Sequence, residues 1–377
     1  MNGDALPGIP ASRPLIGAVT VSTHGTSIEL PAFVADAGEQ AISSSFEFFT
    51  ARIANPNTRE AYGRAVARFC GWAADGGLTL SGLSSVHVAS YLDHLGKDEE
   101  HGGEGMSVPS VKQHLAALRH WLDWLTQRGV LKFNPTAAVR GPRHSQNEGK
   151  TPVLERAEVK ALFAAFEAEL AEIRAADEEA GAKTPPSSPA VAARRQREQQ
   201  RRDIRRIIAL RDKAMLSVML FNIPRVSAVV RMQARDFDDT GDGWLVLHEK
   251  RGKTRRLEAH HQVRDALRVY MAAAGIEPGS RVPLFQSAAG NALALSGMPM
   301  HRTDVGAMVK RRCKAAGLSK SICPHSFRAT GLTLHHLNGG SLQAGAELAG
   351  HESTRTTQRY VRAQGQGRRQ EVERIHW

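Results

Sequence analysis

Six side chains suited to phosphodiester chemistry occur in one order along the second half of the chain: Arg225, Lys250, His325, Arg328, His351 and Tyr360. Paired guanidinium groups can bind a phosphate through charge-assisted hydrogen bonds and stabilise the charge that builds up during cleavage. A lysine can protonate a leaving oxygen, histidines can accept or share protons, and a tyrosine can act as a nucleophile. The set therefore indicates chemistry at a phosphate ester.

Local signals suggest how the chain presents these groups. Pro324 favours a helix start, and His325 and Arg328 would then share one face of that helix because they lie three residues apart. Arg225 follows Pro224, which predicts another helix start whose backbone N–H groups face an anion. Gly350 is a good helix terminator directly before His351.

The order and spacing of these residues resemble the catalytic domain of the tyrosine recombinases, the phage integrase family, over roughly residues 150–362. The HxxR box at His325 and the nine-residue step from His351 to Tyr360 are specific in combination. Two positions depart from the family pattern. Ile223 and Pro224 stand where a Gly-Leu pair is usual, and Ala228 stands where an acidic residue is common.

The resemblance implies an enzyme that cuts and rejoins DNA. Tyr360 would form a 3′-phosphotyrosyl link, and Arg225 and Arg328 would hold the phosphate. The resemblance also assigns the general acid to Lys250, in a hairpin predicted between strands at 244–248 and 254–257; Lys253 in the same hairpin is the alternative. Neither a metal nor another cofactor is expected, because the bond energy is kept in the covalent intermediate.

The same resemblance implies a site-specific recombinase serving the integration, excision or transposition of a mobile element. Its expected partner is double-stranded DNA with paired inverted-repeat core sites, bound by a homotetramer, with accessory DNA-bending proteins or a partner recombinase left open. The alternatives are a type IB topoisomerase, a telomere resolvase, or a catalytically silent DNA-binding factor. The complete set of six residues argues against the last of these.

Composition agrees with a nucleic-acid partner. The chain has 377 residues, of which 41% are hydrophobic, and a formal net charge of +12. A chain so basic usually binds a polyanion. No apolar run approaches the ~20 residues of a membrane span, and no secretory leader is evident at the first residues. The expected location is therefore the cytoplasm, associated with the nucleoid.

Residues 45–143 predict a small helical domain that resembles the SAM-like core-binding domain of the recombinases. Asn57 or Thr58 is a candidate cap for a first helix after Pro56. A second helix from about Pro109 has an apolar stripe made of Val111, Leu115, Leu118, Leu122 and Leu125. Basic residues predicted to contact DNA come from the polar faces of these helices and from the later hairpin: Arg64, Arg68, Lys112, Arg119 and Lys253.

The chain thus divides into four predicted parts. Residues 1–44 form an N-terminal extension, 45–143 the helical core-binding domain, 144–151 a polar linker, and 152–377 the catalytic domain. The predicted fold is mainly α, with a small antiparallel sheet in the catalytic domain, and the two domains are expected to clamp DNA. Within the catalytic domain, about 175–206 resembles an insertion and 361–377 a tail. The basic half of the insertion is predicted to be either a helix on phosphates or a solvated arm.

Overall fold

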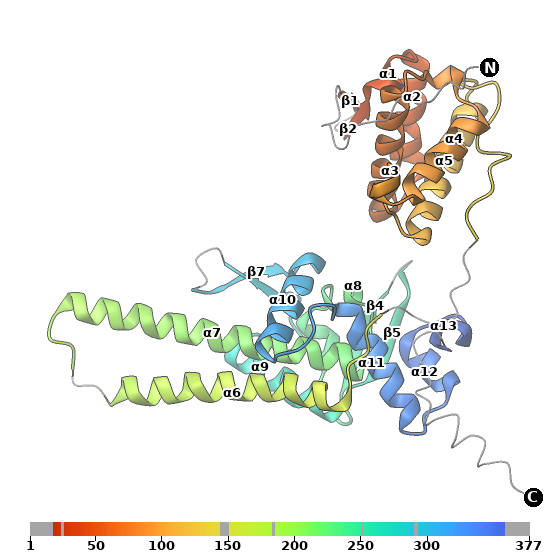
Figure 1. Cartoon of the computed structure of the whole chain (residues 1–377). Helices are drawn as coiled ribbons and strands as arrows, with labels where there is room; N and C mark the ends of the chain where they lie inside the picture. The colour runs from red at the N-terminus through yellow and green to blue at the C-terminus, as the bar shows by residue number, and fades with distance from the viewer. Residues whose placement is uncertain are drawn as a thin grey trace, which may run out of the picture. The chain divides into compact units, whose positions relative to one another are not determined.

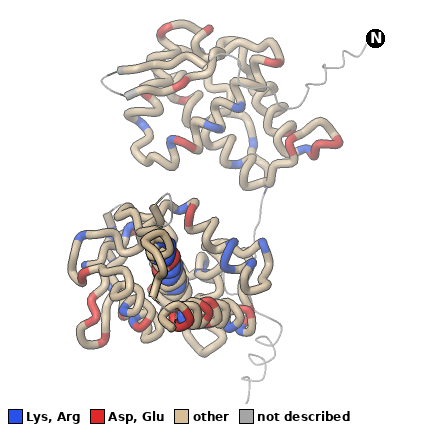
Figure 2. Tube along the Cα trace, turned by 90° about the vertical axis from the view of Figure 1, so that its left-hand side faces the viewer, with Lys and Arg blue, Asp and Glu red and all other residues tan. Residues whose placement is uncertain are grey.

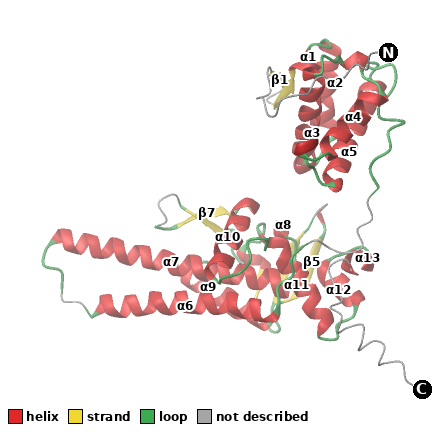
Figure 3. Cartoon of the chain, viewed as in Figure 1, coloured by secondary structure: helices red, strands yellow, loops and turns green. Residues whose placement is uncertain are grey.

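A computed structural model of the chain describes residues 18–23, 26–143, 151–182, 185–249, 252–289 and 293–358. The chain forms two compact units, Met1–Ser145 and Gln146–Trp377, which are described separately (Figure 1). Helices dominate both units, and the sheets of the described residues are small and antiparallel (Figure 3). The prediction of a mainly helical protein with a small antiparallel sheet is therefore confirmed.

The N-terminal unit combines a β-hairpin with a helical bundle. Its elements are β1 (Ala18–Thr23), β2 (Thr26–Pro31), α1 (Ala32–Ala35), α2 (Glu39–Glu47), α3 (Pro56–Asp75), α4 (Ser85–Gly96) and α5 (Val108–Gln127). Helix α3 is capped by Asn55, whose side chain accepts from the backbone N–H of Asn57 at 3.0 Å. The expectation that Asn57 or Thr58 is the cap is thus wrong, because Pro56 already occupies the first helical position.

The core of this unit is built on α5. All five residues of its predicted apolar stripe are buried, and Trp121 beside them donates from its indole nitrogen to the Ser45 hydroxyl at 3.1 Å. Leu30 and Phe33 belong to the same core. Helix α2 also continues past residue 44, the predicted end of the N-terminal extension. The described part of residues 1–44 therefore packs as part of the helical unit.

The second unit places helices around a small sheet. Its helices are α6 (Arg156–Gly181), α7 (Pro189–Phe221), α8 (Val226–Val229), α9 (His261–Ala274), α10 (Arg302–Ala315), α11 (Pro324–Leu337), α12 (Leu342–Ala349) and α13 (Thr354–Gln358). Its strands are β3 (Phe237–Asp238), β4 (Trp244–His248), β5 (Thr254–Glu258), β6 (Gln286–Ala288) and β7 (Leu295–Pro299). The sheet order β3-β4-β5 includes the predicted hairpin.

Helices α6 and α7 form a long antiparallel hairpin that extends from the core (Figure 1). Helix α6 ends at Gly181 and α7 begins at Pro189, which occupies the first helical position of α7. The two helices carry charges of both signs (Figure 2), and Arg202 of α7 pairs with Asp177 of α6 at 2.7 Å.

Arg205 of the same helix pairs with Glu169 at 3.1 Å and with Glu172 at 3.0 Å. The basic half of the predicted insertion is thus helical, and part of its charge is used within the hairpin. Ile204 is also buried, so 175–206 does not lie wholly outside the packed structure.

Close helix packing sets the position of α11. Gly331 of α11 lies so near the Leu220 carbonyl of α7 that an added Cβ would fall well inside van der Waals contact of the Leu220 oxygen. The absence of a side chain at this position therefore lets α11 approach α7. Because Arg328 lies one turn earlier on α11, the same crossing positions that guanidinium.

We expect Gly331→Ala to lower the free energy of unfolding by about 1–3 kcal/mol, as overpacking does when backbone atoms block relaxation. Gly306→Ala is the matched control, because Gly306 lies inside α10 with nothing within 4 Å of an added Cβ. That change should be neutral or stabilise by up to about 1 kcal/mol through helix propensity. Urea unfolding of both variants measures the difference, and equal effects would contradict the packing argument.

Candidate functional site

Four of the six candidate catalytic residues come together in the second unit. His325 and Arg328 lie in the first turns of α11, Arg225 lies directly before α8, and His351 follows α12. Arg328 Nη2 lies 2.6 Å from His351 Nε2, and Arg225 Nη2 donates to the Gly350 carbonyl at 3.4 Å. The other two, Lys250 and Tyr360, lie outside the described residues.

Arg328 is the centre of this cluster. It is only 2% exposed, and its guanidinium donates to the Ala349 carbonyl at 2.6 Å, to the Ile223 carbonyl and to His351. One side chain thus joins the segment before α8, the end of α12 and the histidine. Ile223 has φ of 54°, a left-handed conformation that a β-branched residue rarely adopts. The Arg328 bond to its carbonyl helps to hold that conformation in place.

His351 is held in one tautomer by two partners. A guanidinium can only donate, so His351 Nε2 must accept from Arg328. The proton therefore lies on Nδ1, which donates to the Thr357 hydroxyl at 2.9 Å. Burial, together with Arg328 and Arg225, lowers the pKa of His351 to about 3. The pKa of His325 is also lowered, first by burial and then by the same arginines. Both imidazoles are thus favoured as neutral groups beside two cations.

The lowered pKa of His351 predicts loss of stability in acid. Because the unfolded histidine has a pKa near ~6.5, the unfolded chain binds a proton that the folded chain does not between that value and about 3. The contribution of His351 to the free energy of unfolding is therefore complete above pH ~6.5 and is lost as the pH decreases. We expect His351→Gln to reduce the drop in unfolding free energy between pH 7.5 and pH 5, by on the order of 1 kcal/mol.

Urea unfolding at the two pH values measures this contribution. His336→Gln is the matched control, because His336 is an exposed histidine on the same unit and should leave the pH dependence as it is. An unchanged pH dependence in His351→Gln would contradict the assignment of a neutral His351.

Thr357 is a residue that the sequence analysis did not identify. It is 1% exposed, and it lies on α13, three positions before Tyr360 in the sequence. Its hydroxyl ties α13 to His351, so the segment leading to the candidate nucleophile is anchored at the arginine cluster. The only signal in the sequence is a short polar residue just before the tyrosine.

Arg225 is more accessible than Arg328, with 39% of its side chain exposed. It is the residue before α8, but α8 has only four residues. The predicted helix start is therefore present but short, and the binding of an anion by its N–H groups stays a prediction. Arg225 Nη1 forms an ion pair with Glu249 Oε2 at 2.8 Å. Glu249 follows β4 directly and was also missed from the sequence, where nothing marks it apart from its position next to Lys250.

The predicted hairpin between β4 and β5 is present, and His248 pairs with Thr254 at its end. The Glu249 N–H donates to the Lys253 carbonyl at 2.8 Å, so the backbone pairing of the two strands continues to these residues. Gly252, directly before Lys253, has φ of 72°. Lys253 is exposed, and its ammonium pairs with Glu352 at 3.1 Å. The hairpin thus presents Lys253 beside the segment that follows His351.

The remaining predicted DNA contacts lie on α3 and α5 of the N-terminal unit. Arg64 is exposed and pairs with Glu60 at 2.5 Å, and Arg68 pairs with Glu104. Lys112 is exposed on α5, whereas Arg119 donates to the Val139 carbonyl at 2.6 Å. These four residues stay predicted contacts, and Arg119 also fastens the chain that follows α5.

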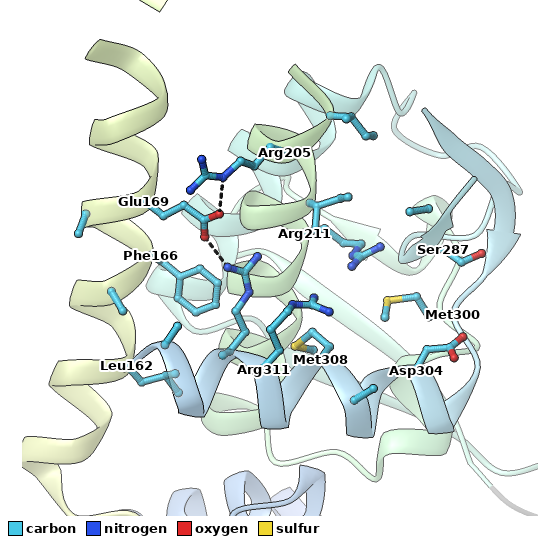
Figure 4. A pocket seen from close by; sticks show the side chains of 18 of the residues that line it. Leu162, Phe166, Glu169, Arg205, Arg211, Ser287, Met300, Asp304, Met308 and Arg311 are labelled. Atoms are coloured by element: carbon cyan, nitrogen blue, oxygen red, sulfur yellow. Dashed lines mark hydrogen bonds and ion pairs between the residues drawn. The ribbon is translucent and has the colours of Figure 1, made fainter. Parts of the chain in front are cut away.

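A cavity of about 1140 Å³ lies away from this cluster, between α6, α7 and α10 (Figure 4). Arg312 at its wall pairs with Asp212 at 2.9 Å and also with Glu169, which accepts from Arg205 as well. Asp212 is fully buried and also forms ion pairs with Arg211 at 2.6 Å and with Arg311 at 3.0 Å. This ion network joins α7 to α10, so we assign it a role in holding the unit together.

Within the described residues, no group of three or more His, Cys, Asp or Glu side chains is arranged to hold a metal ion. The described helices also include none long and apolar enough to cross a membrane.

Comparisons with known proteins show which family the chain resembles. Residues 197–366 match the phage integrase family, and residues 47–129 match the N-terminal SAM-like domain of phage integrases. Tyrosine recombinase XerD of Corynebacterium glutamicum is 26% identical over 309 residues, which are 81% of this chain and 87% of that protein. Tyrosine recombinase XerC of Xanthomonas campestris pv. campestris is 25% identical over 331 residues, 86% of this chain and 85% of that protein.

Solved structures show the same fold. The XerH site-specific recombinase in its post-cleavage complex with a palindromic difH substrate aligns with a TM-score of 0.61 and 15% identity, over 91% of this chain and 88% of that one. A lambda integrase (75–356) dimer bound to a COC′ core site aligns with a TM-score of 0.55 and 16% identity, over 86% of this chain and 95% of that one. By these matches the chain belongs to the tyrosine recombinase (phage integrase) family, and it is a DNA strand-transferring enzyme.

Proposed function

We propose that this protein is a site-specific recombinase in which Tyr360 attacks a DNA phosphodiester. A bond forms between the tyrosine oxygen and phosphorus, and the bond from phosphorus to the 5′ oxygen breaks. The product is a 3′-phosphotyrosyl link and a free 5′-hydroxyl group. The observation that supports this proposal is the junction of Arg225, Arg328 and His351 with α13, which ends two residues before Tyr360.

The described residues support the proposed binding of the phosphate. Arg328 and His351 are fixed by buried and half-buried hydrogen bonds, so they are preorganised before DNA arrives. The side chain of Arg225 is 39% exposed, so it is accessible to a phosphate oxygen. A tyrosine with a reference pKa near ~10 is a weak nucleophile at neutral pH, and two adjacent cations would stabilise its phenolate form. His325, neutral beside the same arginines, would share or accept a proton.

The proposed substrate is double-stranded DNA with paired inverted-repeat core sites, bound by a homotetramer whose two domains clamp the duplex. The net charge of +12 supports the polyanionic partner. We propose a role in moving a mobile element; the Tn1549 transposon integrase in complex with circular intermediate DNA shares the fold at a TM-score of 0.53 and 17% identity. Accessory DNA-bending proteins or a partner recombinase would then set the direction of the reaction.

The experiment that tests this function needs no known target site. The protein is incubated in EDTA with a pool of random nicked duplexes, and DNA that stays attached after denaturation is recovered and sequenced. We expect a DNA family with inverted repeats, attached through its 3′ phosphate. Two such sites should then exchange strands. Relaxation of plasmid lacking any paired site would favour a type IB topoisomerase, and no covalent capture would contradict the proposed function.

Lys250, rather than Lys253, is the proposed general acid. A substrate with sulfur at the 5′-bridging position releases a thiolate that needs no proton, so it bypasses the general acid. We expect sulfur to restore cleavage by Lys250→Ala. Lys253→Ala is the comparison variant, because the exposed Lys253 side chain of the same hairpin pairs with Glu352. Rescue of Lys253→Ala alone would transfer the assignment to Lys253.

A further inference from the structure

The carboxylate of Glu249 lies between two arginines of the candidate site. Only 10% of its side chain is exposed. Its two oxygens take different partners: Oε2 accepts from Arg225 Nη1 at 2.8 Å and Oε1 accepts from Arg255 Nη2 at 3.0 Å. A carboxylate so shielded from water is costly unless its charge is compensated. Here it separates two cations that would otherwise repel each other.

Arg255 extends this contact to the end of α12. Its guanidinium donates to the Glu347 carbonyl at 2.9 Å and also to the Leu348 carbonyl. Burial lowers the pKa of Arg255, and Glu249 opposes that effect. These carbonyls are among the last of the helix that leads to His351. The carboxylate therefore connects Arg225 with the segment that carries His351.

Gly350 shows how closely this arrangement is packed. It has φ of 61°, and a Cβ added there would lie 3.1 Å from both Glu249 carboxylate oxygens and 3.3 Å from Arg255 Cζ. Arg225 Nη2 donates to the carbonyl of the same glycine at 3.4 Å. The Arg225 side chain is thus oriented from two sides, by a carboxylate and by a carbonyl. Ala228, one turn after Arg225, provides no charged partner.

We propose that Glu249 is a positioning residue for Arg225. Its carboxylate fixes the guanidinium of Arg225 in the orientation that binds the scissile phosphate. Through Arg255, which binds the end of α12, it also fixes the position of that guanidinium relative to His351. The inference rests on the proposed function, because it assigns to Arg225 the task of binding the phosphate. A single ion pair uses one face of the fork-shaped guanidinium and leaves other N–H donors for the substrate. Fixing a catalytic group in advance saves the cost of ordering it during the reaction.

The test compares Glu249→Ala and Glu249→Gln with the natural protein on a duplex recovered by covalent capture. Glu249→Gln keeps the shape of the side chain but loses the charge, so it serves if the alanine variant fails to fold. We expect single-turnover formation of the covalent complex to slow about 10- to 100-fold, a typical loss when an outer partner of an active-site group is removed. DNA affinity should change less than threefold. Glu258→Gln is the matched control, an exposed glutamate on β5 of the same hairpin.

Two further comparisons separate positioning from simple structural support. If Glu249 acts through Arg225, the double variant Arg225→Ala/Glu249→Ala should be no slower than Arg225→Ala alone. A methylphosphonate at the scissile position removes the negative oxygen that Arg225 would bind, so the defects of Arg225→Ala and Glu249→Ala should shrink together. Fully additive losses, or a Glu249→Ala defect that persists on the methylphosphonate, would overturn the inference.

The outcomes also distinguish the inference from the function on which it rests. If the natural protein gives a covalent complex and both Glu249 variants form it at the natural rate, only the positioning role is overturned. If the natural protein gives no covalent complex with any duplex, the proposed function is overturned and the inference with it.

Discussion

Tyr360→Phe is expected to abolish the covalent protein–DNA complex while DNA binding stays unchanged, because the substitution removes only the attacking oxygen. Loss of a nucleophile should lower the rate by on the order of 10⁴-fold or more. The measurement uses an end-labelled nicked duplex in EDTA, followed by denaturation and electrophoresis. A slow-migrating band should form with the natural protein and be missing with the variant.

The other tyrosines provide the control. The chain has four, and Tyr91 and Tyr270 are both fully buried, with the pKa of Tyr270 raised to about 12 by burial. Tyr62 is half-buried on α3, with its ring 5.7 Å from that of His120. Tyr62→Phe should therefore keep the covalent band. A band that persists in Tyr360→Phe, or that appears only with added Mg²⁺, would contradict the proposed mechanism.

Replacing either arginine of the site should slow cleavage about 10²–10³-fold, as the loss of one oxyanion donor commonly does. The two arginines should differ in stability. Arg328→Ala leaves the buried Ala349 and Ile223 carbonyls without their donor, so we expect a loss of about 2–4 kcal/mol in unfolding free energy. Arg225 is partly exposed and its partner Glu249 keeps the ion pair with Arg255, so Arg225→Ala should cost less unfolding free energy than Arg328→Ala.

Single-turnover cleavage and urea unfolding of both variants measure these two effects. Arg231→Ala is the control, because Arg231 is an exposed arginine of the same unit whose side chain donates to the His248 carbonyl at 2.6 Å. It should keep both the rate and most of the stability. A normal cleavage rate in Arg328→Ala would remove Arg328 from the proposed phosphate-binding pair.

Several elements follow from signals that lie close together in the sequence. Pro324 begins α11, so His325 and Arg328 share its first turns as their spacing predicts. The alternation around Trp244–His248 and the glycine at 252 predict the β4–β5 hairpin, which is present. Caps, turns and helical periodicity depend on residues a few positions apart. The order of the catalytic boxes is also a property of the sequence, and the family assignment follows from it.

The tertiary structure decided which side chains meet. Arg225 and Glu249 are 24 positions apart, and Arg225 and Gly350 are 125 apart, so no local pattern pairs them. The hydrogen bond from Arg328 to the Ile223 carbonyl depends on the crossing of α7 and α11, where Gly331 allows the two helices to approach closely. The left-handed conformation of Ile223 occurs in the same packed region. Thr357 became relevant only because α13 folds back onto His351. The spacing of residues in the sequence identifies the candidate reacting groups. The packing of the helices fixes their orientation, because the contacts that orient them form only when segments distant in the sequence are brought together.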